Sequence, residues 1–217
     1  FKERFPQFSA DVDNWADSVF LDRVNLTQDG MITRTALLLV GKREKAHKLG
    51  HIAQIVWKCY QDKETFGDIF TIPFIKATTD VLGCIRNYRF KIYPHNSMIP
   101  AEVLKYDTRS ILEGMHNCIL HQDYVCNERI LVIEDTDKLT FENAGGFYEG
   151  DYEEYITGQK TPKRYRNPFL AKAMDNVKMV DSKGYGIHNM FLRQKERYLP
   201  MTDYKGSNDS RDVMHLQ

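Results

Sequence analysis

Hydrophobic and polar positions separate most clearly over residues 108–124, where apolar side chains recur every three or four residues. At about 100° per residue, this spacing predicts an amphipathic helix. Its apolar face carries Ile111, Leu112, Met115, Cys118 and Ile119. Its polar face carries Glu113, His116, Asn117 and His121. Glu113 and Asn117 lie one turn apart and can touch, and Asp107 or Thr108 can cap the start of the helix.

Shorter patterns on either side of this segment predict strands and further helices. Branched and aromatic residues favour strands over 52–60, 90–93, 129–134 and 139–143. Apolar spacing with caps or an opening proline favours helices over 34–40, 73–86, 169–176 and 187–198. Residues 12–24 can form an irregular helix, and the polar tail from Lys205 is expected to fray.

The order of these elements predicts an α/β fold. A helix, a hairpin, a helix, a glycine turn and a helix follow one another over residues 95–205. This order is typical of a two-layer α/β sandwich in which helices cover one face of a mixed sheet. The elements before residue 95 predict a smaller α/β segment in front of the sandwich.

Composition narrows the class of protein. The chain has 217 residues, enough for one large or two modest domains, and 42% of them are hydrophobic. Thirty basic and thirty acidic side chains cancel, so any nucleic-acid or membrane binding must come from a local patch. No apolar run approaches the roughly 20 residues of a membrane helix. The four cysteines lack C-x-x-C spacing, which favours reduced thiols and a cytoplasmic location.

Glu113 and Asn117 are the first candidates for chemistry. A carboxylate can take a proton from water, and an amide oxygen one turn away can hold a hard cation such as Mg²⁺. For an isolated E-x-x-x-N, a solvated polar face is the better interpretation. The trio Glu44, His47 and His51 has spacing that resembles a metal site, but a basic surface turn is favoured because Gly50 interrupts the helix.

Two glycine turns are the second candidates. Gly145-Gly146 and Gly184-x-Gly186 precede segments predicted as helical or lid-like. Backbone amides that point outward in such turns can bind phosphate, because glycine has no Cβ to obstruct the approach. Each turn alone is equally consistent with an ordinary chain reversal. No G-x-x-x-x-G-K-[ST] loop occurs, so the chain carries no helicase motor.

Four motifs together carry a family resemblance. E-x-x-x-N-x-x-x-H-x-D-Y begins at Glu113, N-x-G-G at Asn143, R-N-P at Arg166 and G-x-G-I at Gly184. In this order and spacing, roughly residues 100–205 resemble the C-terminal domain of bacterial RecG-like, Schlafen/AlbA-type transcriptional regulators. That domain is similar to the GHKL (gyrase, Hsp90, histidine kinase, MutL) ATP-binding fold, also called the Bergerat fold. Residues 30–41 resemble the end of the AlbA-type DNA-binding domain of the same regulators.

The resemblance assigns roles to individual residues. It gives Glu113 the general-base position and Asn117 the magnesium-ligand position. The residues that it places along the adenine and the phosphate-facing turn are Asn143, Gly145 and Gly146. The residues that it places where the backbone approaches the phosphates are Gly184 and Gly186. His121, Asp123 and Arg166 are signature residues that either contact the cofactor or tie the structure together, and for His121 and Asp123 the tether is favoured.

Two departures from the family pattern affect these roles. The second GHKL box usually begins with Asp, whose carboxylate accepts a hydrogen bond from the adenine amino group, whereas this chain has Asn143. The G-Y-G-I turn is also shorter than the usual lid and glycine box. Residues 147–165 are charged and rich in tyrosine, and we expect them to form a mobile lid or loop.

The resemblance divides the chain into three parts. Residues 1–95 would hold the tail of an AlbA-type domain and a connecting α/β segment, residues 96–205 a divergent GHKL-like domain, and residues 206–217 a polar tail. The implied function is an adenine-nucleotide-binding regulatory module of a DNA-binding transcriptional regulator, with ATP and Mg²⁺ as cofactors and slow ATPase activity. The alternative is a degenerate scaffold that binds no nucleotide and serves in dimerisation or protein interaction.

Partners follow from the same resemblance. Because the sequence starts at Phe1 without a methionine, we expect a fragment of a longer protein that binds DNA through an N-terminal domain. A homodimer is expected, with the aromatic stretch Tyr148, Tyr152 and Tyr155 exposed for contact with a second copy. No membrane association is expected.

Overall fold

A five-stranded mixed sheet organises the chain in the computed structural model, which describes residues 1–3, 5–61, 64–95, 97–180 and 184–217. The strand order is β4-β3-β7-β8-β9. The bounds are Gln54–Gln61 for β3, Glu64–Thr71 for β4, Ile130–Glu134 for β7, Leu139–Ala144 for β8 and Arg211–Leu216 for β9. Strands β3 and β7 are parallel, and the other neighbours are antiparallel.

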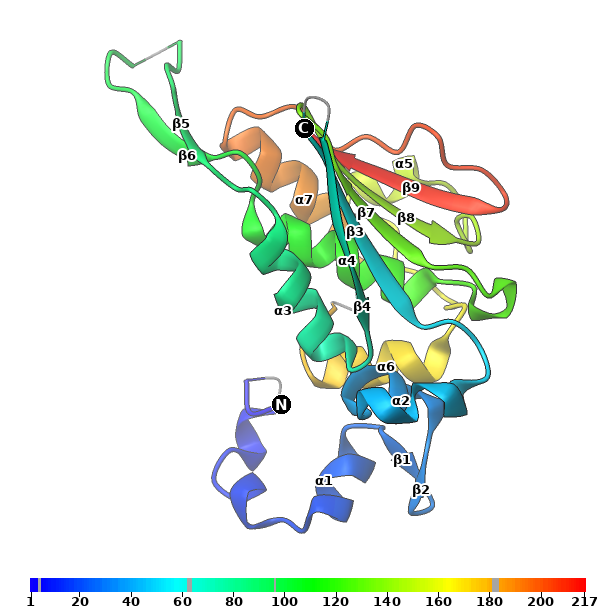
Figure 1. The fold of residues 1–217 in the computed structure, drawn as a ribbon. Helices are drawn as coiled ribbons and strands as arrows, with labels where there is room; N and C mark the ends of the chain where they lie inside the picture. The colour runs from blue at the N-terminus through cyan, green and yellow to red at the C-terminus, as the bar shows by residue number, and fades with distance from the viewer. Residues whose placement is uncertain (4, 62–63, 96, 181–183) are drawn as a thin grey trace.

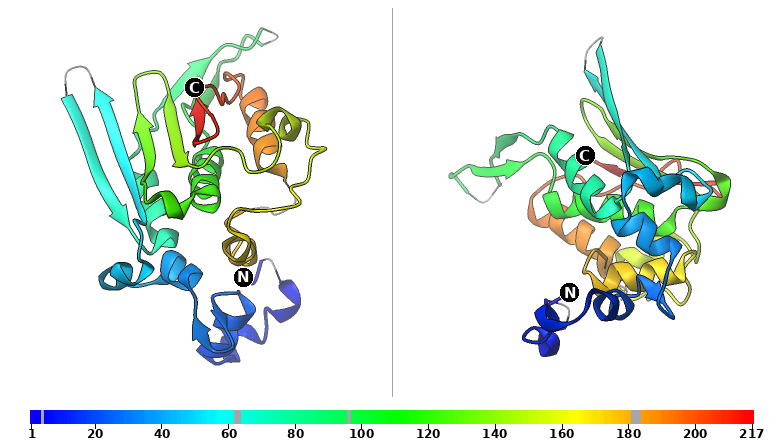
Figure 2. Two further views of the ribbon diagram at one scale, coloured as in Figure 1. Left: turned by 90° about the vertical axis from the view of Figure 1, so that its right-hand side faces the viewer. Right: turned by 60° about the horizontal axis from the view of Figure 1, so that its bottom comes forward.

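Helices cover one face of this sheet, which confirms the predicted α/β architecture (Figures 1 and 2). The helices are α1 Asp17–Arg23, α2 Arg34–Val40, α3 Phe74–Cys84, α4 Thr108–His121, α5 Tyr152–Ile156, α6 Pro168–Asn176 and α7 Tyr185–Glu196. Short 3-10 turns occupy Pro6–Phe8, Val12–Asn14, Arg43–Leu49 and Tyr124–Cys126. Among the described residues, the structure contains no helix with the length and apolar character to cross a membrane.

Helix α4 lies across the middle of the sheet, against β7, β8 and β9. It begins where the side chain of Asp107 accepts a hydrogen bond from the Ser110 amide at 2.9 Å, as the sequence predicts. Gly114 allows the close approach, because a Cβ there would lie 2.5 Å from Met214 Cε. The helix ends at His121, and a 3-10 turn replaces its predicted last residues.

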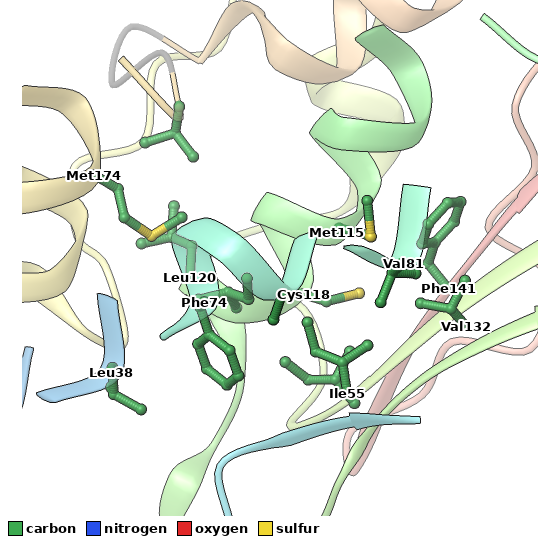
Figure 3. Packing of buried hydrophobic residues seen from close by; sticks show 14 of the residues in the cluster. Leu38, Ile55, Phe74, Val81, Met115, Cys118, Leu120, Val132, Phe141 and Met174 are labelled. Carbon is green, nitrogen blue, oxygen red and sulfur yellow. The ribbon is translucent and has the colours of Figure 1, made fainter. Parts of the chain in front are cut away.

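The core fills the space between the helices and the sheet. Ile55, Val132 and Phe141 point from the sheet toward the apolar face of α4, and all three are buried. Figure 3 shows these side chains meeting Met115 and Cys118 of α4 and Val81 of α3. The apolar face predicted for α4 is therefore the one that it buries, with Leu112 only partly covered.

Two small hairpins lie outside this sheet. Strands β1 (Thr27–Gln28) and β2 (Met31–Ile32) precede α2. Strands β5 (Arg89–Ile92) and β6 (Ala101–Leu104) form an arm that projects from the body of the molecule (Figure 1). The apolar pattern predicts β5 within one residue but not β6.

Three predictions about elements were wrong. The tail expected to fray contains β9, which pairs with β8 along its whole length. Residues 64–71, given no element, form the edge strand β4, whose side chains are mostly exposed and therefore show no apolar alternation. The helix expected over 12–24 begins only at Asp17, after a separate 3-10 turn.

Candidate functional site

A cavity opens between the helical layer, the last two strands of the sheet and the segment 147–165. Helix α4 contributes Glu113, Asn117 and His121 to its wall, and the start of α7 contributes Gly184 and Gly186. The strands and the adjoining loops contribute Phe141, Asn143, Gly146, Tyr204, Asp212 and Met214. Seven of the ten residues predicted for the site therefore line one cavity. Asp123, Gly145 and Arg166 do not line it.

The helical wall brings Glu113 against the start of α7. Both Glu113 and Asn117 are half-buried on α4 and open to the cavity. Gly186 lies so close to Glu113 that a Cβ at position 186 would overlap the Glu113 Oε1 atom. Gly184 has φ +84° and forms the N-cap of α7, so only glycine takes this conformation without strain. The first turn of α7 thus faces the carboxylate that the sequence assigned to general-base chemistry.

The strand wall holds an amide and a carboxylate directly opposite each other. Asn143 on β8 is the register partner of Asp212 on β9, so the two side chains leave the same face of the sheet. Asn143 is buried, and its Nδ2 donates to the carbonyl oxygen atoms of Ala144 and Gly145, at 3.1 and 3.4 Å. Asp212 Oδ1 accepts from Ser207 Oγ at 2.9 Å.

Asp212 is deep in the protein but keeps surface toward the cavity. Burial raises the pKa of its carboxyl group to about 6, against the hydrogen bonds from Ser207 and Val213 and the charge of Arg166, which lower it. The side chain is nevertheless only half-buried by exposed area. The raised pKa and the remaining exposed area are consistent, because the accessible part of the Asp212 side chain lines the cavity. The charged form is therefore poorly solvated yet reachable by a ligand.

Tyr204 adds a hydroxyl without a hydrogen-bond partner to the same wall. Its side chain is 4% exposed, and its hydroxyl group finds no partner among the described residues. Burial raises the pKa of this hydroxyl, and the carboxylates of Asp212 and Glu113 raise it further, which places both near it. Its ring stacks on Tyr152, with centroids 4.8 Å apart. A buried polar group without a partner calls for an explanation, and a bound ligand is one.

The N-x-G-G turn is held by the chain that leads into β9. The Gly145 amide donates to the Ser210 carbonyl at 2.8 Å, and the Gly146 amide donates to the Asp209 carbonyl at 3.2 Å. Both amides that the sequence assigned to a phosphate-facing turn are thus already used within the protein. Gly145 has φ +86°, and a Cβ there would lie 2.7 Å from Arg166 Cζ. Glycine is needed at this position for backbone conformation and for close packing.

Asp123 and Arg166 form a tether beside the cavity. Arg166 Nη1 donates to Asp123 Oδ2 at 3.2 Å, and Nη2 donates to the Gly146 carbonyl at 2.9 Å. Asn167 Nδ2 donates to the carbonyl groups of Leu120 and Gln122, at 2.8 and 2.9 Å. The R-N-P motif therefore fastens the end of α4 to the glycine turn. These contacts match the structural alternative for Asp123 and Arg166.

The two histidines on the predicted polar face of α4 are half-buried, like Glu113 and Asn117. Burial lowers the pKa of His116 to about 4, and its Nδ1 lies 2.6 Å from the Met179 carbonyl oxygen. Burial and the charge of Arg166 lower the pKa of His121 to about 4 as well. The His121 ring stacks on Tyr165, with centroids 6.2 Å apart. At neutral pH both rings are uncharged.

The segment 147–165 covers the cavity. It contributes Tyr148, Glu149, Tyr155, Pro162, Arg164 and Tyr165 to the lining. Tyr155 is buried, and its hydroxyl donates to the Glu149 carbonyl at 2.9 Å. Of the three tyrosines expected to be exposed for dimer contact, Tyr148 is exposed, Tyr152 is partly covered and Tyr155 is buried. The expectation of an exposed aromatic stretch was therefore wrong for Tyr155.

Sequence reasoning missed Asp212 and Tyr204. Asp212 lies in the tail that was predicted to be polar and frayed, and Tyr204 lies directly before that tail. Residues 212–216 follow the period-2 pattern of a strand, in which Asp212, Met214 and Leu216 alternate with Val213 and His215. The charge of Asp212 at an inward position obscured this pattern. No cluster of three or more His, Cys, Asp or Glu side chains that could hold a metal occurs among the described residues. A cation here would depend on Asn117 and on ligands from a bound molecule.

Comparisons with known proteins support the family resemblance. Residues 128–214 match the family model described as "Putative ATP-dependent DNA helicase recG C-terminal". This part of the chain is therefore similar to the RecG C-terminal, HATPase-like family. The match includes Asn143, Arg166 and Asp212 but not α4. A sequence search among curated proteins gave no match.

A solved structure shares the fold. The crystal structure of the DIP2311 protein from Corynebacterium diphtheriae superposes with a TM-score of 0.74 at 15% sequence identity. The similarity covers 99% of this chain and 42% of that protein. At this identity the likeness concerns the fold alone. The chain spans less than half the length of that protein.

Proposed function

We propose that this chain, part of which is similar to the RecG C-terminal, HATPase-like family, binds an adenine nucleotide as the regulatory module of a bacterial, DNA-binding transcriptional regulator. The module comprises residues 96–205 and also β9. The observation that carries the proposal is the single cavity lined by Glu113, Asn117, Asn143 and the start of α7. The sequence brings these residues from three separate motifs, and all of them line one cavity.

The cavity offers surfaces that fit the parts of a nucleotide. Phe141 and Met214 give an apolar floor for a planar base, and Asp212 and Tyr204 give polar groups beside it. The first turn of α7, a helix of 12 residues, carries amides that lack intrahelical partners and could bind phosphate. Arg164 on the covering segment adds a positive charge at the wall. The base would thus lie against the strand wall, and the phosphates would lie at the start of α7 on the helical wall.

The proposed chemistry is slow hydrolysis of ATP that depends on Mg²⁺. Mg²⁺, when bound with the nucleotide, supplies neutralisation of the phosphate charge. Asn117 would hold the ion through its amide oxygen. Glu113 would accept a proton from water as the water attacks. His121, uncharged and stacked on Tyr165, would support this wall without taking the proton.

Calorimetry with Mg²⁺ and a non-hydrolysable ATP analogue tests the proposal most directly. Saturable binding that is competed by ATP is the expected result. A folded chain that binds no adenine nucleotide at millimolar concentration would end the proposal. The chain's α/β fold, checked by circular dichroism on the same sample, separates true absence of binding from misfolding.

A second candidate function is a regulatory scaffold that has lost nucleotide binding and serves in dimerisation or protein interaction. The observation that favours it is that the polar groups of the glycine turn already have hydrogen-bond partners within the protein. The amides of Gly145 and Gly146 and the side chain of Asn143 all have partners within the protein. Light scattering at high concentration, with and without nucleotide, distinguishes the candidates, because the scaffold predicts a dimer that nucleotide does not affect.

A further inference from the structure

We propose that Asp212 is the specificity-determining residue for the base, and that its carboxylate accepts a hydrogen bond from the exocyclic amino group of adenine. This inference rests on the proposed nucleotide site and goes beyond it by naming the group that selects the base. The resemblance attached base recognition to Asn143. The structure assigns it to the residue on the neighbouring strand.

The position of Asp212 is fixed by the sheet. Strand β9 pairs with β8 so that Asp212 faces Asn143, and Met214 faces Phe141. Side chains alternate along a strand, so Asp212 and Met214 lie on the cavity side, where both line the wall. Figure 1 shows β9 next to β8 in the sheet. The carboxylate is therefore on the same face of the strand as the apolar side chain of Met214.

The surroundings of Asp212 leave it able to accept from a ligand. Ser207 donates to Oδ1, whereas a carboxylate has about four acceptor positions on its two oxygen atoms. No described residue forms an ion pair with Asp212, and Arg166 acts on it only at longer range. A carboxylate in such a place is poorly compensated for its lost solvation. A donor from a ligand would supply the missing compensation.

Tyr204 gives independent support for a ligand at this point. Its hydroxyl group is buried, has no partner among the described residues and lies near Asp212. An acceptor and a donor that line the same cavity suit the edge of adenine, where an amino group stands next to a ring nitrogen. The apolar neighbours Phe141, Cys118 and Met214 favour the flat base over the polar ribose. Ribose recognition by Asp212 is therefore the alternative that a test must separate.

The test compares ATP with the triphosphate of purine riboside, which lacks only the amino group. Calorimetry with Mg²⁺ is done on the full chain and on Asp212→Asn, which keeps the size of the side chain. The wild-type protein is expected to bind ATP at least about tenfold more tightly, because hydrogen bonds to charged groups contribute a tenfold to hundredfold effect. In Asp212→Asn this preference should fall to about one, through loss of ATP affinity alone.

Glu142→Gln is the matched control. Glu142 lies on β8 but points to the opposite face, where it pairs with Arg211 at 2.9 Å. It should keep the wild-type preference. A preference unchanged in Asp212→Asn would overturn the inference, and so would an equal loss of affinity for both triphosphates, which indicates ribose recognition. Absence of binding to either triphosphate in the wild-type chain is a different failure, since it removes the proposed function itself.

Discussion

The two walls of the cavity hold their polar groups in different ways. On the helical wall, Glu113 and Asn117 are half-buried and stand one turn apart on the side of α4 that lines the cavity. On the strand wall, Asn143 and Asp212 are fixed opposite each other by backbone pairing and lie over an apolar floor. A half-exposed carboxylate can exchange protons with water, whereas a poorly solvated one is suited to recognising a donor. The helical wall therefore suits chemistry and the strand wall suits selection.

The largest expected effect separates chemistry from binding on the helical wall. Glu113→Ala should lower ATP turnover by about a hundredfold or more, because general-base catalysis typically contributes that much. Nucleotide affinity should change little, since the base acts only in the transition state. Steady-state phosphate release and calorimetry measure the two quantities on the same protein. Parallel losses in both would show that Glu113 serves binding, and Glu142→Ala controls for the loss of a charge.

The next effect concerns stability and arises on the strand wall. The pKa of Asp212 is about 6 in the folded protein against an ordinary value of 3.8. The folded state therefore binds more protons between these values, so the stability due to this group falls as pH rises from about 4 to 6. Asp212→Asn removes the ionised form and should be more stable than wild type at pH 7, by at most about 3 kcal/mol.

Denaturant unfolding at several pH values measures this difference. The advantage of Asp212→Asn should shrink toward pH 4, where the wild-type carboxyl group is protonated in the folded protein. The groups that act on Asp212 are Arg166, Tyr204 and Cys118. Tyr204 and Cys118 do not change charge in this range, since burial raises the pKa of the Tyr204 hydroxyl and of the Cys118 thiol. A variant that is less stable at every pH would assign Asp212 a purely structural role.

A smaller effect tests the contact between α7 and α4. Gly186→Ala should displace the Glu113 carboxylate, because the new Cβ would overlap Oε1. We expect turnover to fall about tenfold. The free energy of unfolding should rise by less than the roughly 1 kcal/mol that a change from glycine to alanine usually gives in a helix. Gly83→Ala in α3 is the control, since nothing lies within 4 Å of its added Cβ. If both variants gain stability equally and keep turnover, the contact does not position Glu113.

The smallest effects are expected from the side-chain amides of Asn117 on the helical wall and Asn143 on the strand wall. Asn117→Ala should weaken nucleotide affinity several-fold to about tenfold only when Mg²⁺ is present, because its proposed role is to hold the ion. Asn143→Ala should weaken affinity to a similar extent with or without Mg²⁺, because its wall contacts the base. Calorimetry in Mg²⁺ and in chelator checks both. If each variant loses only stability, the polar faces of both walls are structural.

The helical wall could be predicted from the sequence because its information is local. Glu113 and Asn117 are one turn apart, and Asp107 caps their helix, so a short window contains the geometry. The hairpin of β7 and β8 was also predicted, because its strands adjoin one short turn. Periodicity and caps act over a few residues, which is the range that such reasoning can follow.

The strand wall could not be predicted because its information is not local. Asp212 meets Asn143 only through the pairing of β9 with β8, and nothing in either segment specifies that partner. The amides of Gly145 and Gly146 looked available in the sequence, but the carbonyl groups that occupy them come from Asp209 and Ser210. Edge strands such as β4 are missed for a related reason, since exposure on most positions removes the alternation that marks a strand.

The place of β9 at the edge of the sheet has a consequence for the dynamics of the cavity. Among the described residues, backbone pairing on the outer side of β9 is limited to two isolated bridges, from His215 to Asp203 and from Arg211 to Asn208. With so few bonds on that side, β9 can detach in a local opening that leaves the rest of the sheet intact. Detachment of β9 would remove Asp212 and free the glycine turn at the same time. A ligand held by Asp212 binds only the closed form and must slow this opening. The rate of amide hydrogen exchange in residues 211–216 would then fall when a ligand occupies the cavity.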